Sequence, residues 1–257
     1  MFELSMSQPK LYGWFHILCL LMIIGLTIIL LKLKRNEKNI RLIVGSISIL
    51  VMILEVYKQL YYSFDYGQSV IFTYQWNIFP WQFCSTPMYV GLIAAVVRNQ
   101  KLHYRLCCYL STYALMAGIC VMLYPCSVFT ENVLINIQTM VNHGTMVSIG
   151  VYLLLSEYIK CELQTLKEAS IVFAVCIYIA IALNEWAYLS GLLEDYPFNM
   201  FYISPYVQGG LPVYGTIQQL LPYPLDLMVY IGGFTAGSGM ILWIVKRKDV
   251  FYEYFSR

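Results

Sequence analysis

Asn136-Ile-Gln-Thr-Met-Val-Asn-His-Gly144 is a polar run inside an otherwise apolar segment that covers residues 133–156. The segment has the length of a helix that crosses a bilayer, which needs about 20 mainly apolar residues. Polar side chains at membrane depth are costly, and they usually face the interior of a helix bundle or a water-filled cavity. We therefore expect the rest of the chain to surround the polar face of this helix.

The composition is that of an integral membrane protein without a large soluble domain. Of the 257 residues, 60% are hydrophobic and 12% are charged, and the mean hydropathy is +0.65, whereas soluble domains carry about 25% charged residues. The 23 Tyr and 5 Trp suit the aromatic belts at membrane interfaces. A net charge of +2 with short basic loops is not typical of nucleic-acid binding, so we expect no nucleic-acid partner.

Seven segments are long and apolar enough to span a membrane. They lie at about residues 13–33, 41–63, 79–98, 105–125, 133–156, 168–191 and 225–246. We expect an all-α, polytopic fold in which residues 1–257 form a single transmembrane domain, a seven-transmembrane-helix bundle. The long connector 192–224 is rich in Pro, Gly and Tyr, and we expect it to form a cap over the outer mouth of the bundle.

Basic residues, Lys and Arg, occur in every second connector between the segments. The first, third and fifth connectors and the C-terminal tail are basic, and the second, fourth and sixth contain acidic residues but no Lys or Arg. Basic residues favour the cytoplasmic side of a membrane. The pattern therefore predicts an outside N-terminus, a cytoplasmic C-terminus and a multi-pass location in the cell membrane.

Polar side chains gather in the outer half of the expected bundle. They are Gln82, Cys84, Asn136, Gln138, Asn142, His143, Asn184, Glu185 and Asp226. A charged pair at i, i+3, Glu55 and Lys58, lies nearer mid-membrane and can neutralise itself on one helix face. We expect an outward-facing polar pocket within the membrane, whose binding residues are Gln82, Asn136, Gln138, Asn142, Asn184, Glu185 and Asp226. The alternative is a dry hydrogen-bond network that holds the helices together.

The third segment opens with a polar stretch, Phe79-Pro-Trp-Gln-Phe-Cys-Ser-Thr-Pro87. Pro80 suits a first helical turn, and Pro87 is expected to kink the helix because an interior Pro removes a backbone hydrogen bond. At 1.5 Å per residue, Cys84 would lie about 8 Å deep and His143 about 15 Å deep. A tilt of either helix would bring the thiol and the imidazole together.

Cys84 and His143 are the candidate catalytic residues. A neighbouring His or positive charge converts a thiol into a nucleophile by favouring its thiolate. Asn142 or Glu185 would orient the imidazole. A metal site made by His143, Glu185 and Asp226 is a weaker alternative, and we expect neither a metal nor a cofactor.

Two motifs resemble those of the YwaF-type bacterial integral membrane proteins. They are Phe79-Pro-Trp-Gln-Phe-Cys-Ser-Thr-Pro-Met88 and Ile135-Asn-Ile-Gln-Thr-Met-Val-Asn-His-Gly144, and the resemblance covers most of the chain. Distant animal relatives of that family are described as phospholipid acyltransferases with a membrane-embedded Cys and His. The resemblance implies acyl transfer or hydrolysis on a membrane lipid. Cys84 would take the acyl group as a thioester and His143 would move the proton.

Two other functions stay open. The outward pocket, the Glu55/Lys58 pair and the broken third helix also suit a transporter or binding protein for a small polar solute. The lack of a recognisable inverted repeat argues against a common secondary transporter. A sensor or assembly factor without chemistry is the third hypothesis.

Overall fold

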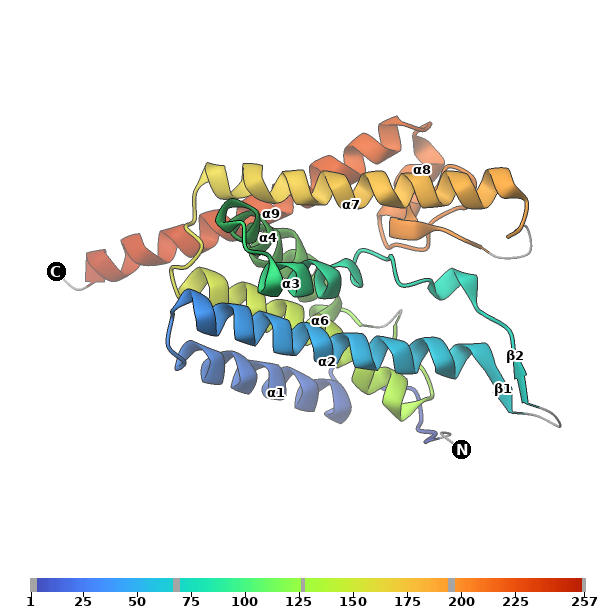
Figure 1. The fold of residues 1–257 in the computed structure, drawn as a ribbon, viewed down its shortest axis with the longest axis horizontal. Helices are drawn as coiled ribbons and strands as arrows, with labels where there is room; N and C mark the ends of the chain where they lie inside the picture. The colour runs from blue at the N-terminus through green and yellow to red at the C-terminus, as the bar shows by residue number, and fades with distance from the viewer. Residues whose placement is uncertain (1–3, 67–69, 126–127, 194–196, 256–257) are drawn as a thin grey trace.

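The computed structural model describes residues 4–66, 70–125, 128–193 and 197–255, and its architecture is a bundle of long helices lying side by side (Figure 1). In chain order the helices are α1 (Trp14–Leu31), α2 (Glu37–Ser63), α3 (Thr86–Val96), α4 (Gln100–Tyr109), α5 (Leu115–Leu123), α6 (Val133–Leu155), α7 (Leu163–Ser190), α8 (Tyr214–Leu220) and α9 (Leu225–Phe255). A π-helical turn, η2 (Leu110–Ala114), joins α4 to α5 into one continuous rod.

Within the described residues, five helical rods are long and apolar enough to cross a membrane. They are Trp14–Leu31, Glu37–Ser63, Gln100–Leu123, Leu163–Ser190 and Leu225–Arg247. α6 is 23 residues long but carries the polar run, and α3 has only 11 residues. Helices therefore occur at all seven expected places, while five of them meet the criterion for a span.

The outer helices of the bundle present apolar side chains to their surroundings. On α1, Leu21, Met22 and Ile29 are each more than half exposed. Such a face is unfavourable in water and suits lipid tails. α6, in contrast, is mostly buried and packs against α1, α2 and α5.

Glycines let the neighbours of α6 approach it closely. A Cβ at Gly144 would lie 2.3 Å from Ile23 of α1, and one at Gly150 would lie 2.6 Å from Leu115 of α5. These distances are shorter than side-chain contacts allow, so the two positions need small residues.

Asparagine caps set the starts of three helices. Asn36, Asn99 and Asn132 each accept a hydrogen bond at the side-chain oxygen from a backbone N–H three residues on, at 2.8–3.0 Å. This contact satisfies one of the unpaired donors in a first helical turn. At the other end of α7, Gly191 adopts the left-handed conformation (φ 63°) that commonly ends a helix.

The third helix is shorter than the sequence indicated. We expected it from residue 79, but α3 begins at Thr86, with Pro87 in its first turn. There the missing N–H of Pro87 has no helical partner to lose. The residues before α3 form a turn in which the N–H groups of Ser85 and Thr86 both donate to the backbone oxygen of Gln82. The predicted kink at Pro87 and the predicted helical turn at Pro80 are therefore wrong.

Other boundaries also differ from the prediction. α2 begins at Glu37 rather than at 41, the fourth rod at Gln100 rather than at 105 and α7 at Leu163 rather than at 168, and α9 continues past residue 246 to Phe255. The connector after α2 is a small antiparallel hairpin, β1 (Phe64–Tyr66) and β2 (Val70–Phe72), with Phe64 opposite Phe72. A 3-10 turn, η1 (Trp76–Ile78), then leads to the turn before α3.

The connector 192–224 is partly helical and partly buried. It contains the short α8 and a 3-10 turn, η3 (Met200–Tyr202). Met200 and Phe201 are fully buried, and the Phe201 ring stacks on that of Phe83 with centroids 5.4 Å apart. The segment Phe198–Ile203 therefore belongs to the core of the bundle, next to the turn that carries Cys84.

Candidate functional site

The polar run of α6 splits into separate contacts rather than forming one wall. Asn136 binds the loop that precedes its own helix: its side chain accepts from the backbone N–H of Thr130 and donates to the backbone oxygen of Thr130, both at 2.8 Å. Gln138 instead donates to Glu55 of α2 at 3.1 Å. Asn142 donates to the backbone oxygen of Cys84 at 3.2 Å. Asn136 thus lies apart from the other two amides.

Glu55 is the centre of a buried network between α2 and α6. Its side chain is 3% exposed, and Oε1 accepts from Lys58 Nζ and Gln59 Nε2, each at 2.7 Å. Gln138 Nε2 donates to the other carboxylate oxygen, Oε2. A buried carboxylate needs such partners to offset the loss of water. The predicted pairing of Glu55 with Lys58 is therefore confirmed.

The network reaches the segment that leads to Cys84. Gln59 Nε2 also donates to the backbone oxygen of Ile78 at 2.7 Å, and Tyr74 Oη donates to Gln59 Oε1 at 2.8 Å. The carboxylate of Glu55 is thereby linked to residues 74–78, which precede the Cys84 turn. Gln59 and Tyr74 were not among the predicted site residues, because neither lies in a motif and both find their partners only through the fold.

Cys84 lies in the turn before α3, and it is partly exposed. The hydrogen bond from Asn142 to its backbone oxygen fixes this turn against α6. Burial is the main influence on the thiol, and the charges of Lys58 and Glu55 are close enough to act on it as well. The thiol therefore lies in a largely apolar site beside one ion pair.

His143 is 5% exposed, and its ring orientation is set by its own helix. Nδ1 lies 2.8 Å from the backbone oxygen of Thr139. A carbonyl oxygen only accepts, so Nδ1 donates and the neutral ring keeps its lone pair on Nε2. The expectation that Asn142 or Glu185 orients the imidazole is wrong, because the Thr139 carbonyl does so.

In the part of the chain that the structure describes, no hydrogen bond joins the Cys84 thiol to the His143 ring. The two residues instead share neighbours. Asn142, which binds Cys84, directly precedes His143, and the charge of Lys58 acts on both the thiol and the imidazole. The structure therefore brings Cys84, Asn142, His143 and Lys58 into one region.

Gln82 and Asn184 hold the connector that follows α7. Gln82 donates to the backbone oxygen of Asn199 and accepts from the N–H of Phe201, both at 2.9 Å. Asn184 accepts from the N–H of Met200 at 2.7 Å and donates to its backbone oxygen at 3.1 Å. The two amides together hold the backbone of residues 199–201 by four hydrogen bonds, as in the hydrogen-bond network that was the alternative to a pocket.

The two acidic candidates lie near the connector and do not approach His143. Both carboxylate oxygens of Glu185 accept from Tyr206 Oη, at 3.0 and 2.8 Å, and this hydrogen bond raises the pKa of Tyr206. Asp226 is 4% exposed and accepts from Tyr214 Oη at 3.2 Å. Among the described residues, no three His, Cys, Asp or Glu side chains gather closely enough to hold a metal ion.

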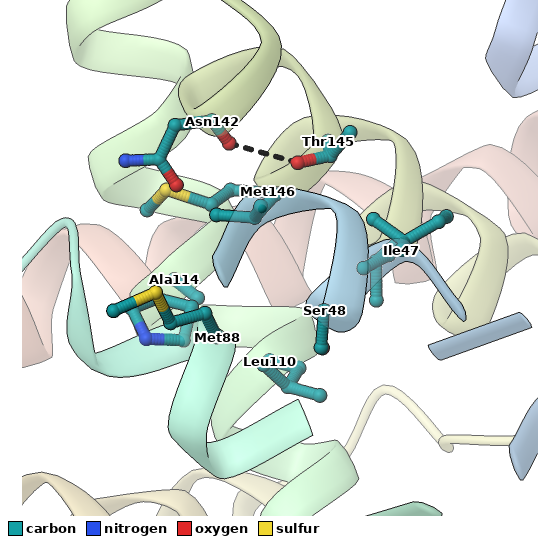
Figure 2. Close-up of a pocket in the computed structure, with 11 residues that line it drawn as sticks. Ile47, Ser48, Met88, Leu110, Ala114, Asn142, Thr145 and Met146 are labelled. Carbon is teal, nitrogen blue, oxygen red and sulfur yellow. Dashed lines mark hydrogen bonds between the residues drawn. The ribbon is translucent and has the colours of Figure 1, made fainter. Parts of the chain in front are cut away.

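Two cavities adjoin these residues. A cavity of about 20 Å³ lies next to Asn142, between α2, α3, α6 and the η2 turn (Figure 2). It is lined by Ile47, Ser48, Val51, Pro87, Met88, Leu110, Ala114, Asn142, Thr145, Met146 and Ile149. Its size suits about one water molecule. A second cavity, of about 270 Å³, lies between α7 and the connector and is lined by Asn184, Ala187, Tyr188, Leu193, Phe198, Ser204, Tyr206 and Val207.

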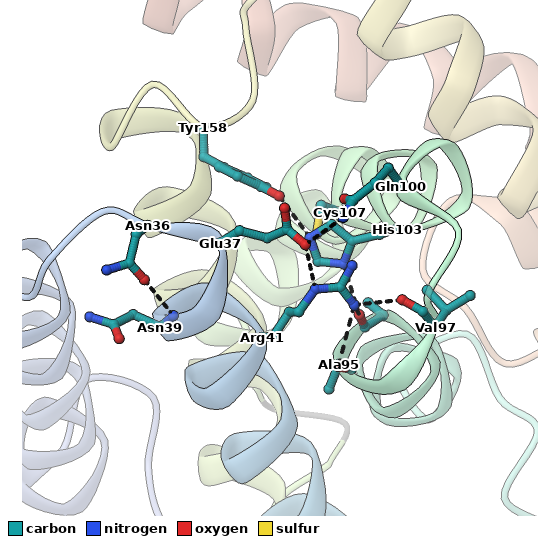
Figure 3. Close-up of polar contacts among 11 residues, drawn as sticks. Asn36, Glu37, Asn39, Arg41, Ala95, Val97, Gln100, His103, Cys107 and Tyr158 are labelled. Carbon is teal, nitrogen blue, oxygen red and sulfur yellow. Dashed lines mark hydrogen bonds and ion pairs between the residues drawn. The ribbon is translucent and has the colours of Figure 1, made fainter.

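A third polar cluster lies at the far end of α3 (Figure 3). Arg41 Nη1 donates to the backbone oxygens of Ala94 and Val97 at 2.9 and 2.7 Å, and Arg41 Nε pairs with Glu37 at 2.7 Å. His103 bonds to the same Ala94 oxygen at 2.7 Å. These contacts satisfy carbonyl groups at the end of a helix. Nothing in the sequence pattern pointed to Arg41 as the donor at this helix end.

A bundle of long apolar helices around buried polar side chains defines a multi-pass membrane protein. A model of the TMEM164 family matches residues 6–244, and the chain belongs to that family. The match supports the expected class, a membrane protein, but it does not support the YwaF-type family that the two motifs resemble. No curated protein and no solved structure matches the chain.

Proposed function

We propose that the protein transfers an acyl chain between membrane lipids, with Cys84 as the nucleophile and His143 as the base. The hydrogen bond from Asn142 to the backbone oxygen of Cys84, at 3.2 Å, carries the proposal. It connects the thiol-bearing turn to the residue directly before His143. The imidazole tautomer set by Thr139 leaves Nε2 able to accept a proton, which a base requires.

The reaction has two half-reactions. In the first, Nε2 of His143 takes the thiol proton, the sulfur attacks the carbonyl carbon of a lipid ester, and the ester C–O bond breaks. The leaving lipid oxygen takes the proton from His143, and the acyl group stays on Cys84 as a thioester. In the second, His143 takes the proton of an acceptor hydroxyl, whose oxygen attacks the thioester. The C–S bond breaks, and the proton returns to the sulfur. With water as the acceptor, the same steps give hydrolysis.

The missing hydrogen bond between the thiol and the imidazole does not exclude this chemistry. Contacts between a nucleophile and its base are often loose without substrate and tighten in the complex. Cys84 has a single side-chain torsion, and its rotation redirects the sulfur without moving the turn. The partial exposure of Cys84 also supports access of a lipid ester to the sulfur.

The test is to trap the thioester. Purified protein in lipid nanodiscs would be given a phospholipid with an isotopically labelled acyl chain and a lysophospholipid acceptor. We expect a labelled, hydroxylamine-sensitive adduct on Cys84 and labelled product lipid. Both should disappear in Cys84→Ala and persist in Cys19→Ala, which removes another partly exposed thiol. Undiminished acyl transfer in Cys84→Ala would overturn the proposal.

The proposed orientation places the Cys84 turn toward the outer leaflet of the cell membrane. Its support is the alternation of basic and acidic connectors along the sequence. In Figure 1 the two ends of the chain lie at opposite ends of the bundle. Labelling of single cysteines introduced at Gln8 and at Lys34 with an impermeant reagent tests it, because position 8 should react in intact cells and position 34 only after lysis.

The transporter alternative gains no comparable support. The cavity next to Asn142 has room for about one water molecule, and hydrogen bonds to Gln59 and Gln138 enclose the Glu55 carboxylate. No observation on the described residues favours solute transport over lipid chemistry.

A further inference from the structure

Two amides of α6 hold two different elements against consecutive turns of one helix. Gln138 binds the Glu55 carboxylate of α2, and Asn142 binds the backbone of Cys84. Residues four apart in a helix share a face and are separated by about 6 Å along its axis. The carboxylate and the cysteine turn are therefore neighbours on the same side of α6.

Lys58 and Glu55 are not equivalent members of their ion pair. The Glu55 carboxylate accepts from three side chains, which are Lys58, Gln59 and Gln138. Lys58 has a side chain that is 20% exposed, and among the described residues its only polar contact is Glu55, at 2.7 Å. An ammonium has three donors, so the carboxylate is fixed in place while the ammonium keeps unused hydrogen-bonding capacity.

Several titratable groups surround the Cys84 thiol. They are Glu55 and Lys58 on α2, Tyr109 on α4, Tyr202 in the connector and Tyr230 on α9. His143 on α6 directly follows Asn142, whose side chain binds the Cys84 backbone. Lys58 is the cation in this set, and its ammonium lies 2.7 Å from Glu55 Oε1, on the side of α6 that also holds the Cys84 turn. Charges interact strongly where little water screens them.

From this arrangement we infer that Lys58 is a positioning residue whose ammonium stabilises the Cys84 thiolate, and that Glu55 holds the ammonium in place and limits its effect. The opposite signs of the two side chains make them act in opposite directions on the same sulfur. The role of Lys58 in catalysis rests on the proposed function, because the thiolate is the reactive form of a nucleophilic cysteine. Its effect on the thiol does not depend on that function.

The rate of alkylation of Cys84 by iodoacetamide measures its thiolate fraction. The full-length protein in nanodiscs would be sampled over time at several pH values, and each cysteine peptide would be quantified by mass spectrometry. We expect Lys58→Met to slow alkylation of Cys84 about tenfold, and Glu55→Gln to accelerate it about threefold, since tenfold corresponds to one pKa unit. Cys19 in α1 serves as the internal control, and its rate should not change.

Further variants separate charge from packing. Lys58→Arg keeps the positive charge, so its Cys84 rate should stay within about threefold of the wild-type rate. Removing one member of a buried ion pair can unfold a protein. The double variant Glu55→Gln/Lys58→Met avoids this by removing both charges together. We expect its Cys84 alkylation rate to lie between those of the two single variants. Equal rates in Lys58→Met and the wild type would overturn the inference, as would changes of the same sign in Lys58→Met and Glu55→Gln.

Alkylation needs neither lipid nor turnover, so the two proposals can fail separately. A Cys84 rate that depends on Lys58 without acyl transfer would leave the inference standing and remove the proposed function. If a thioester forms on Cys84 but the alkylation rate of Cys84 does not depend on Lys58, the proposed function stands and the inference fails.

Discussion

The carboxamide of Asn142 donates a hydrogen bond of 3.2 Å to the backbone oxygen of Cys84. This contact joins the polar run of α6 to the polar stretch before α3. It also gives Asn142 a different role from Asn136, which lies less than two turns away on the same helix and binds a loop instead.

Asn142→Leu should impair activity much more than stability. The variant removes one hydrogen bond, worth about 1 kcal/mol, but it frees the turn that positions the Cys84 sulfur. We expect acyl transfer to fall by about tenfold to a hundredfold, since small displacements of a reacting group are costly. Labelled product lipid and the thermal unfolding midpoint would be measured on the same sample.

Asn136→Leu is the matched control for that prediction. It breaks the contacts with Thr130 and leaves a backbone N–H and C=O unpaired. We expect a loss of about 1–3 kcal/mol in the free energy of unfolding, with acyl transfer retained in the folded fraction. If Asn136→Leu abolished transfer while Asn142→Leu preserved it, the distinct roles of the two amides would be refuted.

Gln82→Leu should loosen the connector that follows α7. The variant leaves the Asn199 oxygen and the Phe201 N–H without their partner, which costs about 1–3 kcal/mol. Limited proteolysis should then cut within residues 197–210 at protease concentrations that spare the wild type. Gln75→Leu is the control, because Gln75 is only partly buried and its side chain bonds only to the Thr73 oxygen among the described residues.

The contact between Tyr206 and Glu185 should be retained at neutral pH and lost in alkali. The hydrogen bond to the carboxylate raises the pKa of Tyr206, so this contact contributes fully below the ordinary tyrosine pKa of about 10 and disappears as the pH rises through the higher folded-state pKa. Tyrosine ionisation would be followed by ultraviolet absorbance against pH in the wild type and in Tyr206→Phe. The difference between the two titrations gives the titration curve of Tyr206 alone. In Glu185→Gln that curve should move to lower pH, and an unchanged curve would contradict the assignment.

Arg41→Met should destabilise the bundle at the far end of α3. The guanidinium is the shared donor for backbone oxygens of Ala94 and Val97, and hydrogen bonds to charged groups contribute about 1.5–3 kcal/mol each. We expect a clear drop in the thermal unfolding midpoint in detergent. Lys38→Met removes an exposed charge one turn from Arg41 on α2 and should leave the midpoint unchanged.

Hydropathy was sufficient to locate the helices, because a long apolar run has few other structures in lipid. It could not locate the start of α3. A Pro favours a first helical turn at either position 80 or position 87, and the turn around Gln82 decides between them through tertiary contacts. The hairpin of Phe64–Tyr66 with Val70–Phe72 was missed for a similar reason, since three-residue strands carry almost no periodicity.

Partners within one helix were predictable from the sequence, but partners on other helices were not. Contacts within one helix followed from spacing, and the Glu55–Lys58 pair was found at i, i+3 as expected. Contacts between helices depend on helix rotation, which the sequence of one chain does not give. The bonds from Gln138 to Glu55, from Asn142 to Cys84 and from Gln82 to the connector are all of this second kind.

Gln82 stands two residues before Cys84, and its amide binds the buried connector that also stacks on Phe83. The thiol-bearing turn and this part of the connector are thus joined as one rigid unit. Any substrate that displaced residues 199–201 would therefore also move the turn that carries the Cys84 sulfur, so events at the connector and at the thiol are mechanically coupled.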